Sequence, residues 1–445
     1  MFGLLTMERV RRITALAVPI VLGMVSQNLL NLIDTAFVGH LGDSALAAVG
    51  MGGFVNWLLV AALIGLGSGV QATAARRMGE GKEGETAVGL NAALIVAACA
   101  GIPMAILGMQ FSEEIFGLLN DDPQVQRQGA EYLSARFIAV PFVAANFAFR
   151  GFWNGTNRPM NYMSTLVVMH AINIILDYGL IFGRLGLPEM GVAGAGYATS
   201  IALVCGTSMY VVLGLVQGRA NGFMRARGVK EALPVVLRLS VPAGLQQVMF
   251  SAGFVIFFVI AGKIGTDVLA ASNVIINLIL VSTLPAVGLG LAGASLVGQS
   301  LGAGDIAEAR RWGWSVAIIG SGVMGLLGLI QALGARTWLG IFLPDSPATL
   351  ELAVVPLIII GLYQAFDGIG VVLLNILIGV GDTVAALKIN TLAQWVLFLP
   401  LAWIFAVELG FGMMALWIGM GAYRLLIAVL VSVRFRSGAW ALAKA

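Results

Sequence analysis

The chain has 445 residues, of which 59% are hydrophobic and only 11% are charged. Water-soluble domains carry about 25% charged residues, so this composition excludes a soluble protein and indicates a polytopic membrane protein. The net charge is +3, but the basic residues lie in short segments between apolar runs, which is typical of membrane topology and not of nucleic-acid binding.

Apolar runs separated by glycine, proline and charged residues predict an all-α fold with twelve transmembrane helices. The expected spans are 13–38, 47–75, 87–110, 128–152, 160–183, 190–217, 235–262, 270–298, 313–335, 350–378, 384–407 and 411–434. Basic residues directly precede the first long span, so we expect no cleavable signal peptide. Cys99 and Cys205 both fall inside spans, so we expect no disulfide.

The first span, 13–38, is unusual because it carries a proline and a carboxylate. Asp34 lies roughly 30 Å from the start of the helix, in the far half of the membrane. Asn31 and Gln27 share its helical face. A carboxylate at this depth either faces a cavity and an ion, or is a structural group bonded to a neighbouring helix. Pro19 favours a bend and is the predicted conformational hinge.

The fifth and sixth spans supply further polar side chains at a comparable depth. Asp177, Asn173 and His170 lie on one face of the fifth span, and Thr199 is in the sixth. We therefore predict that Asp34, Asn173, Asp177 and Thr199 converge into a cation or proton site. Two carboxylates in a medium of low dielectric repel, so a proton or Na⁺ must neutralise them, and both ions remain open. For His170, a proton-shuttle role and plain packing also remain open.

Two charged residues, Asp367 and Arg424, lie deep inside the last three spans. Asp367 is the only carboxylate expected inside the second half of the molecule. It is a second coupling site, a cation-attracting wall residue or a plain interhelical hydrogen-bonding group. Arg424 either snorkels to the surface or pairs with a carboxylate. The residues assigned to an accessory role or to the substrate cavity are Gln27, Asn31, His170 and Asp367.

The two halves of the chain repeat each other at a shift of 223 residues, which pairs Pro19 with Pro242 and Gly65 with Gly288. Each half has an even number of spans, so the two six-helix repeats are parallel. The predicted parts are an N-terminal lobe (1–217), a cytoplasmic linker (218–234) and a C-terminal lobe (235–445). Asp34 aligns with Phe257, so its carboxylate belongs to the first lobe alone.

Charge placement predicts the orientation. Placing the N-terminus in the cytoplasm leaves most of the 25 Lys and Arg on the cytoplasmic side, as the positive-inside rule requires. We therefore expect a multi-pass protein of a bacterial inner membrane, with both termini cytoplasmic. The acidic segment 112–124 is then expected to be an outward-facing loop.

No sequence motif supports catalysis: HExxH and P-loop patterns are missing, and no Cys/His cluster has metal-ligand spacing. We expect a transporter driven by an ion gradient, acting as a monomer in the bilayer. A lipid-linked oligosaccharide flippase is the alternative, although it would need several Arg or Lys for pyrophosphate. An intramembrane enzyme and a passive channel are further alternatives.

Five stretches together resemble the multidrug and toxic compound extrusion (MATE) transporters. They are the first helix with NLIDTAFVGHLG, FRGFWNGTNRP at 149–159, NIILDYG at 173–179, GVAGAGYAT at 191–199 and AFDGIGVVLLNILIGVGDT at 365–383. The resemblance covers nearly the whole chain. It implies secondary active efflux of small organic, mostly cationic and amphipathic compounds, coupled to inward movement of protons or sodium.

The resemblance also implies roles for single residues. The first-lobe cation-binding positions of the family match Asp34, Asn173, Asp177 and Thr199. Pro19 matches the proline at which the first helix bends, and Asp367 matches an acidic position that some branches use. Gln246 and Gln247 stand where other branches carry a glutamate. This departure makes the chain more similar to the DinF-like branch than to the NorM or eukaryotic branches.

Overall fold

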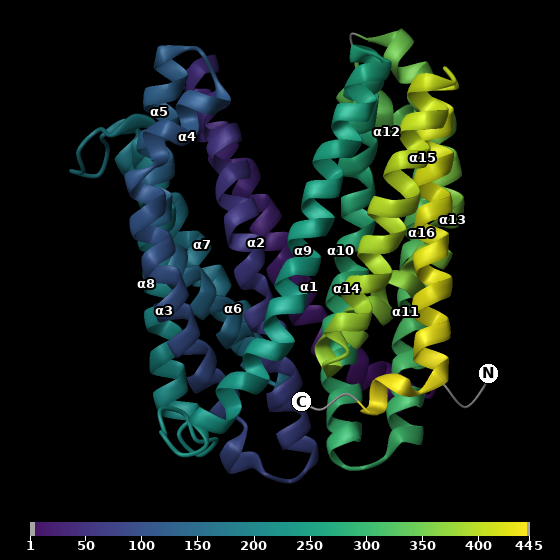
Figure 1. The fold of residues 1–445 in the computed structure, drawn as a ribbon. Coiled ribbons are helices and arrows are strands. Elements are labelled where there is room, and N and C mark those ends of the chain that lie inside the picture. Colours follow the sequence, from purple (N-terminus) through teal and green to yellow (C-terminus); the bar gives the residue numbers. More distant parts are fainter. Residues whose placement is uncertain (1–4, 345, 443–445) are drawn as a thin grey trace. The chain divides into compact units, whose positions relative to one another are not determined.

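The structure is a computed structural model that describes residues 5–344 and 346–442, and this part of the chain is helical without a strand. The helices of the first half are α1 (Met7–Gly39), α2 (Asp43–Gly79), η1 (Glu83–Glu85), α3 (Val88–Gln110), α4 (Ser112–Leu119), α5 (Pro123–Phe137), α6 (Val140–Gly155), α7 (Pro159–Phe182) and α8 (Gly191–Gln217) (Figure 1). Those of the second half are α9 (Val229–Ile264), α10 (Thr266–Gly302), α11 (Ile306–Leu333), α12 (Ala335–Phe342), α13 (Pro347–Val380), α14 (Thr383–Thr391), η2 (Leu392–Phe398), α15 (Leu399–Trp403), η3 (Ile404–Glu408), α16 (Gly412–Ser437) and η4 (Ala439–Leu442).

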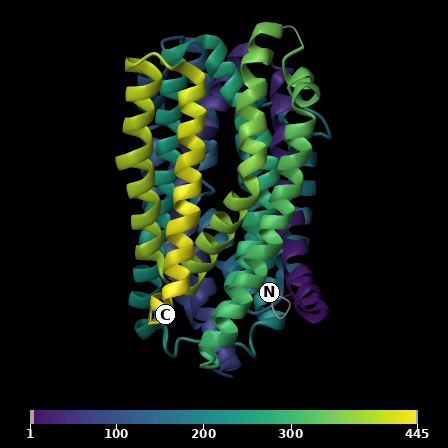
Figure 2. The same cartoon turned by 90° about the vertical axis from the view of Figure 1, so that its right-hand side faces the viewer.

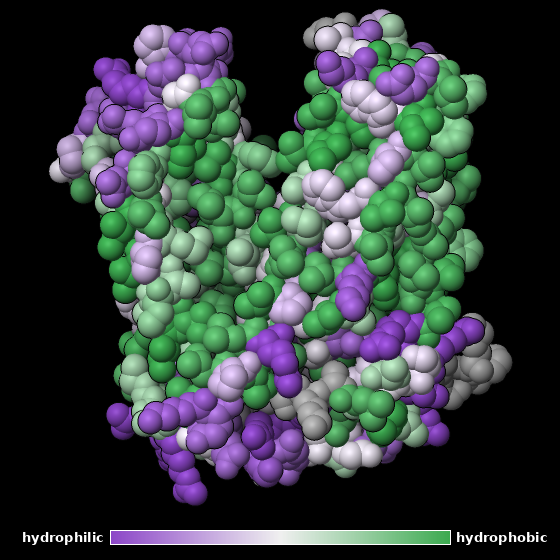
Figure 3. All heavy atoms as spheres, viewed as in Figure 1, coloured by the Kyte–Doolittle hydropathy of each residue, from purple (hydrophilic) through white to green (hydrophobic). Residues whose placement is uncertain are grey.

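The membrane-spanning helices agree with the prediction of twelve. Among the described residues, eleven helices are long and apolar enough to cross a bilayer, and the bent pair α5 and α6 makes twelve when counted as one span. The pair bends by 48°. Pro141, near the start of α6, accounts for this break because proline cannot donate a backbone hydrogen bond and crowds the residue before it. Apolar side chains cover the sides of the helices, and hydrophilic ones gather near their ends (Figure 3).

The 223-residue repeat is present in the helix boundaries themselves. Helix α2 begins at residue 43 and α10 at 266, and α4 begins at 112 and α12 at 335. The expectation of a loop over 112–124 is wrong for residues 112–119, which form α4, and for residues 123–124, which begin α5. Phe116 of this short helix is fully buried, and a Cβ on Gly129 or Gly52 would meet its ring. The segment is helical because one apolar face packs on the first half of the chain.

The chain packs as two compact units, and both boundaries lie inside a helix. One unit contains residues 22–244, and the other contains the described residues up to 21 together with those from 245 onward. The boundaries fall two residues after Pro19 in α1 and two residues after Pro242 in α9. The expected lobes divide the chain differently, since they keep α1 whole and start the second lobe at residue 235. Proline deletes one helical hydrogen bond, so a helix changes its packing partners most easily there.

Glycines allow the beginnings of α9 and α1 to pack closely within their own units. In one unit, a Cβ on Gly65 would overlap the backbone of Ser240 and Gly244 in α9. In the other unit, a Cβ on Gly288 would overlap Val21 of α1. Gly65 and Gly288 are repeat partners. Their pairing in the sequence therefore reflects helix packing, as expected for small residues at membrane helix contacts.

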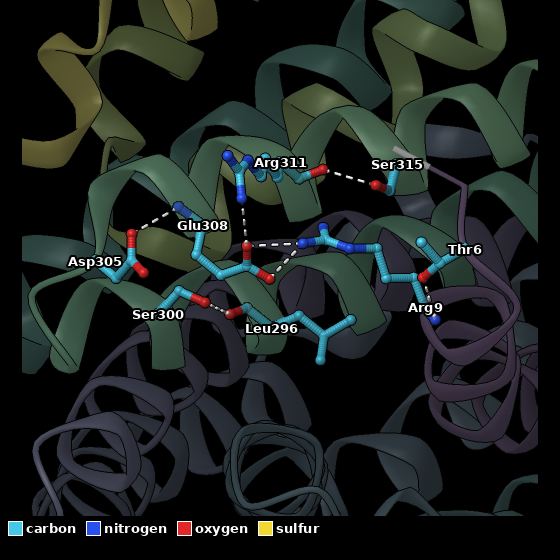
Figure 4. Close-up of polar contacts among 8 residues, drawn as sticks. All are labelled: Thr6, Arg9, Leu296, Ser300, Asp305, Glu308, Arg311 and Ser315. Atoms are coloured by element: carbon cyan, nitrogen blue, oxygen red, sulfur yellow. Dashed lines mark hydrogen bonds and ion pairs between the residues drawn. The ribbon is translucent and has the colours of Figure 1, made fainter. Parts of the chain in front are cut away.

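A polar clamp attaches the start of α1 to α11 within one unit. Arg9 Nη2 donates to Glu308 Oε1 at 2.6 Å and to Oε2 at 2.7 Å (Figure 4). The Arg9 guanidinium also lies 4.6 Å from the centre of the Trp312 ring. Glu308 is held in place because its backbone N–H donates to Asp305, the N-cap residue of α11. The same carboxylate accepts a longer contact from Arg311 at 3.8 Å.

The eleventh predicted span is one continuous run of helical types. It consists of α14, η2, α15 and η3, where η2 and η3 are π-helical, and it packs alongside α16 (Figure 2). In η2, Trp395 Nε1 donates to the Met249 carbonyl at 3.0 Å, and Gln394 Nε2 donates to the Phe250 carbonyl at 3.2 Å. These bonds attach the wide turn to α9 within one unit.

Candidate functional site

The centre of the candidate site is a pair of polar residues on α7. Asn173 and Asp177 lie one helical turn apart, and Asn173 Nδ2 donates to Asp177 Oδ2 at 2.7 Å. Asp177 is 0% exposed and Asn173 is 1% exposed. A carboxylate buried in this way needs compensation of its charge, because an isolated buried charge is very unfavourable. The amide supplies only part of that compensation.

Asp34 of α1 adds a second carboxyl group to the pair. The side chains of Asp34 and Asp177 lie within hydrogen-bonding reach of each other. Asp34 Oδ1 and Asp177 Oδ1 are both buried and accept no hydrogen bond from the described residues. A bond between two carboxyl groups requires one proton, since two carboxylates have no donor to share. The structure thus brings Asp34, Asn173 and Asp177 together in one unit. That they bind a coupling ion stays a prediction.

Helix α5 contributes two neighbours that the sequence analysis missed. Arg136 acts electrostatically on both carboxylates, and Tyr132, one turn earlier and 8% exposed, interacts with the same groups. The signal that could have found Arg136 is its position inside the expected span 128–152, where a cation needs a partner. Asp34 and Asp177 are nevertheless absent from the ion pairs formed by the described side chains.

Thr199 is the fourth predicted ligand, and its hydroxyl bonds within its own helix. Thr199 Oγ1 donates to the Ala195 carbonyl of α8 at 3.0 Å. The next residue, Ser200, donates to the Ala135 carbonyl at 2.7 Å and so attaches α8 to α5 beside Arg136. Participation of Thr199 in an ion site therefore stays a prediction.

A chain of hydrogen bonds joins α1 and α7 at residues that precede Asp34 and Asp177 on the two helices. Ser26 Oγ lies 2.6 Å from His170 Nδ1, and His170 Nε2 lies 3.2 Å from Gln27 Oε1. Gln27 Nε2 in turn donates to Asn31 Oδ1 at 3.2 Å. With the Gln27 oxygen facing the ring, His170 Nε2 carries the proton and Nδ1 accepts from Ser26. Both ring nitrogens of His170 are thus engaged, which agrees with the packing alternative for this residue.

Asp367 lies outside this cluster, in the other unit. It forms an ion pair with Arg424 of α16, with Nη2 at 2.8 Å from Oδ1 and 2.9 Å from Oδ2. The pairing alternative for Arg424 is therefore confirmed over snorkelling. Among the described residues, no group of three or more His, Cys, Asp or Glu side chains could hold a metal ion.

The chain matches a known family twice along its length. The MatE family model matches residues 19–179 and again residues 242–404. The chain belongs to the MatE family. The two matches of this MatE protein start at Pro19 and Pro242, which are 223 residues apart, so the family match reproduces the internal repeat.

Relatives of known name cover the chain almost completely. The MatE protein is 30% identical over 436 residues to a probable multidrug resistance protein NorM of Rhodopseudomonas palustris, covering 94% of this chain and 90% of that one. It is 27% identical over 439 residues to a probable multidrug resistance protein NorM of Thermotoga maritima, covering 97% and 93%. The predicted placement in the DinF-like branch stays a prediction.

The fold is also shared with a solved transporter. A structure described as the outward-facing conformation of a multidrug resistance MATE family transporter of the MOP superfamily matches with a TM-score of 0.89. The sequences are 22% identical, and the match covers 98% of this chain and 96% of the other. At this identity, the comparison establishes the architecture of the MatE protein.

Proposed function

We propose that this protein is a secondary active transporter that expels small organic, mostly cationic and amphipathic compounds across a bacterial inner membrane. The exchange is driven by the inward movement of protons, with sodium as the alternative coupling ion. The protein performs no chemical step on its substrate. The family membership and the multidrug-resistance names of the relatives support the transport class. The flippase alternative is not favoured by the same comparisons.

The observation that carries the coupling proposal is the carboxyl pair of Asp34 and Asp177. The two groups are within hydrogen-bonding reach, each has one unsatisfied buried oxygen, and Asn173 bonds to one of them. When the pair is fully ionised, the two charges repel in a medium of low dielectric. Uptake of one proton converts the repulsion into a hydrogen bond. The proton therefore stabilises one arrangement of α1 against α7 by a differential free energy, which is what an ion-driven conformational change requires.

Sodium would act on the same groups through oxygen ligands. The carboxyl and amide oxygens of Asp34, Asp177 and Asn173 are hard donors of the kind that alkali cations accept, and Thr199 would complete the predicted set. Movement of α1 would then follow from bending near Pro19, where the helix passes from one unit to the other.

The deciding experiment uses the purified protein in liposomes with a pH gradient and a sodium gradient imposed separately. We expect a cationic dye to be moved against its own gradient by the pH gradient, and the movement to collapse when a protonophore removes that gradient. Transport that follows only the sodium gradient would assign sodium instead. A passive channel would equilibrate the dye and never concentrate it, and this outcome would reject the proposal.

A further inference from the structure

Asp367, the buried acid of α13, has a cationic partner in the same chain. Asp367 on α13 is 3% exposed, and its two carboxylate oxygens lie 2.8 and 2.9 Å from Nη2 of Arg424 on α16. The two helices pack against each other within one unit. These short contacts are typical of a charge-assisted pair. The guanidinium thus compensates the acid without help from a mobile ion.

Two tyrosine side chains, Tyr363 and Tyr423, interact with the pair. Tyr363 lies one turn before Asp367 on α13, and a Cβ on Gly421 of α16 would meet its ring at 2.9 Å. Tyr423 stacks on Phe398 of η2 with ring centres 5.0 Å apart. The titratable groups that interact with the pair are these two tyrosines, Tyr363 and Tyr423. Neither is charged at neutral pH, so within this set the arginine is the only cation that compensates Asp367.

Asp34 and Asp177 in one unit and Asp367 in the other therefore differ in whether an ion pair compensates their charge. Asp34 and Asp177 take part in none of the ion pairs of the described residues and keep unsatisfied oxygens, whereas Asp367 is engaged by Arg424. An exchangeable ion must bind and leave during each cycle. A guanidinium attached to α16 cannot leave, and its charge occupies the position that a proton or Na⁺ would need. The site of Asp34 and Asp177 can therefore exchange an ion, whereas Asp367 cannot.

Resting on the proposed antiport, we propose that Arg424 is a fixed counter-ion that excludes a coupling ion from Asp367. Arg424 thereby determines how many ions are exchanged per substrate. Coupling then passes through Asp34 and Asp177 alone, and the acid of α13 is a positioning group for α16. Without Arg424, the carboxylate of Asp367 would be buried and uncompensated, so it would have to take up a proton or a sodium ion instead.

The test measures the number of ions exchanged per substrate molecule in liposomes. A known substrate gradient is imposed, and the ion gradient at which net transport stops gives this ratio. The variant D367N/R424Q removes both charges while keeping similar side-chain shapes. We expect it to move the same number of ions per substrate as the unchanged protein. A lower number in this variant, measured beside an unchanged protein that is fully coupled, would overturn the inference. An unchanged protein that shows no coupling at all would instead reject the proposed antiport.

A second measurement does not depend on transport. In R424Q, the unpaired Asp367 must be neutralised on folding, so we expect the thermal midpoint in detergent to fall as pH rises, or to rise with added sodium. The conservative variant R424K keeps a cation and should restore the weaker dependence of the unchanged protein. A thermal midpoint of R424Q that responds to pH and sodium just as the unchanged protein does would contradict the role of Arg424 as the counter-ion.

Should D367N/R424Q fail to fold, D34N supplies the remaining test. We expect no ion flux coupled to substrate in that variant, because Asp367 is paired with Arg424 and cannot exchange an ion. Coupled flux that persists in D34N would show that another acid exchanges ions and would overturn the inference.

Discussion

At the residue scale, the buried acids differ in how their charges are compensated. Asp177 receives one hydrogen bond from Asn173 and faces Asp34, while Arg136 acts on both acids without forming an ion pair with either. An acid whose charge is only partly compensated can bind a mobile ion, whereas an acid paired with a fixed cation has its charge compensated already. The proposed exchange therefore depends on incomplete compensation at the first site.

The substitution Asp34→Asn tests this dependence. An amide cannot release a proton at physiological pH, so we expect ion-driven efflux to fall to the background level while the protein still folds. Dye extrusion by inside-out vesicles measures the effect. Asp43→Asn, at the exposed start of α2, is the matched control and should transport normally. Normal drug resistance in cells that carry D34N would refute the coupling role of this residue.

At the element scale, the helices α1 and α9 are the unusual parts of the fold. Each begins in the unit formed mainly by the opposite half of the chain, and each leaves that unit two residues after a proline. The close contacts at Gly65 and Gly288 fix the first parts of these helices against α2 and α10. The segments after the prolines belong to the other unit. Each of the two helices is thus divided into an early part and a later part.

Glycine substitution in α2 tests the close packing of α9. A Cβ on Gly65 would overlap the backbone of Ser240 and Gly244, so we expect Gly65→Ala to lower the free energy of unfolding by about 1–3 kcal/mol. Gly53, on the same helix, has open space within 4 Å of the position that a Cβ would take. Gly53→Ala should therefore be neutral or stabilising by about 0.5–1 kcal/mol. Thermal unfolding in detergent compares the stabilities of G65A and G53A. Equal stabilities of the two variants would refute the packing argument.

Proline substitution in α1 tests the predicted hinge. Pro19→Ala restores the missing backbone donor and favours a straight helix. We expect slower substrate export with little loss of substrate binding, because the change affects the motion and leaves the carboxylates intact. Pro103→Ala, in the interior of α3, is the control and should leave the export rate unchanged. Identical export rates in the unchanged protein, P19A and P103A would show that transport does not depend on Pro19.

At the scale of the whole molecule, each unit contains the first part of a helix, α1 or α9, whose later part belongs to the other unit. Specific contacts attach each of these first parts to its unit. In one unit, Arg9 and Glu308 connect α1 to α11, and Trp312 lies beneath the guanidinium. In the other, Asn91 of α3 donates to the carbonyls of Gly222 and Arg225 at 2.9 and 3.1 Å and thereby holds the segment before α9. Both attachments link residues that are distant in sequence and close in one unit.

The clamp on α1 can be tested by removing one charge. Glu308→Gln leaves the Arg9 guanidinium without its anionic partner, and we expect a loss of about 1–3 kcal/mol in local stability. Faster hydrogen exchange of the amides in the first turns of α1 measures that loss. Glu85 is the repeat partner of Glu308, is largely exposed, and contacts Arg77 at 3.8 Å. Glu85→Gln is therefore the control, and exchange as slow in E308Q as in E85Q would refute the clamp.

Much of the architecture could be predicted from the sequence because membrane helices obey local rules. A span must satisfy its backbone hydrogen bonds within itself and present apolar side chains to lipid, so composition and length alone predict the twelve spans. The repeat required only the recurrence of proline and glycine at a fixed shift. The grouping of Asn173 with Asp177 followed from helical periodicity, which is also a local property.

Other features depended on contacts that no local pattern specifies. The helix over 112–119, the break between α5 and α6, and the unit boundaries inside α1 and α9 arise from packing against distant segments. The nearness of Arg136 to the first carboxyl pair and the pairing of Arg424 with Asp367 are likewise tertiary facts. The sequence by itself determined which charges enter the membrane. Only the tertiary structure decided which of them face one another, because electrostatic compensation depends on distance in space and not along the chain.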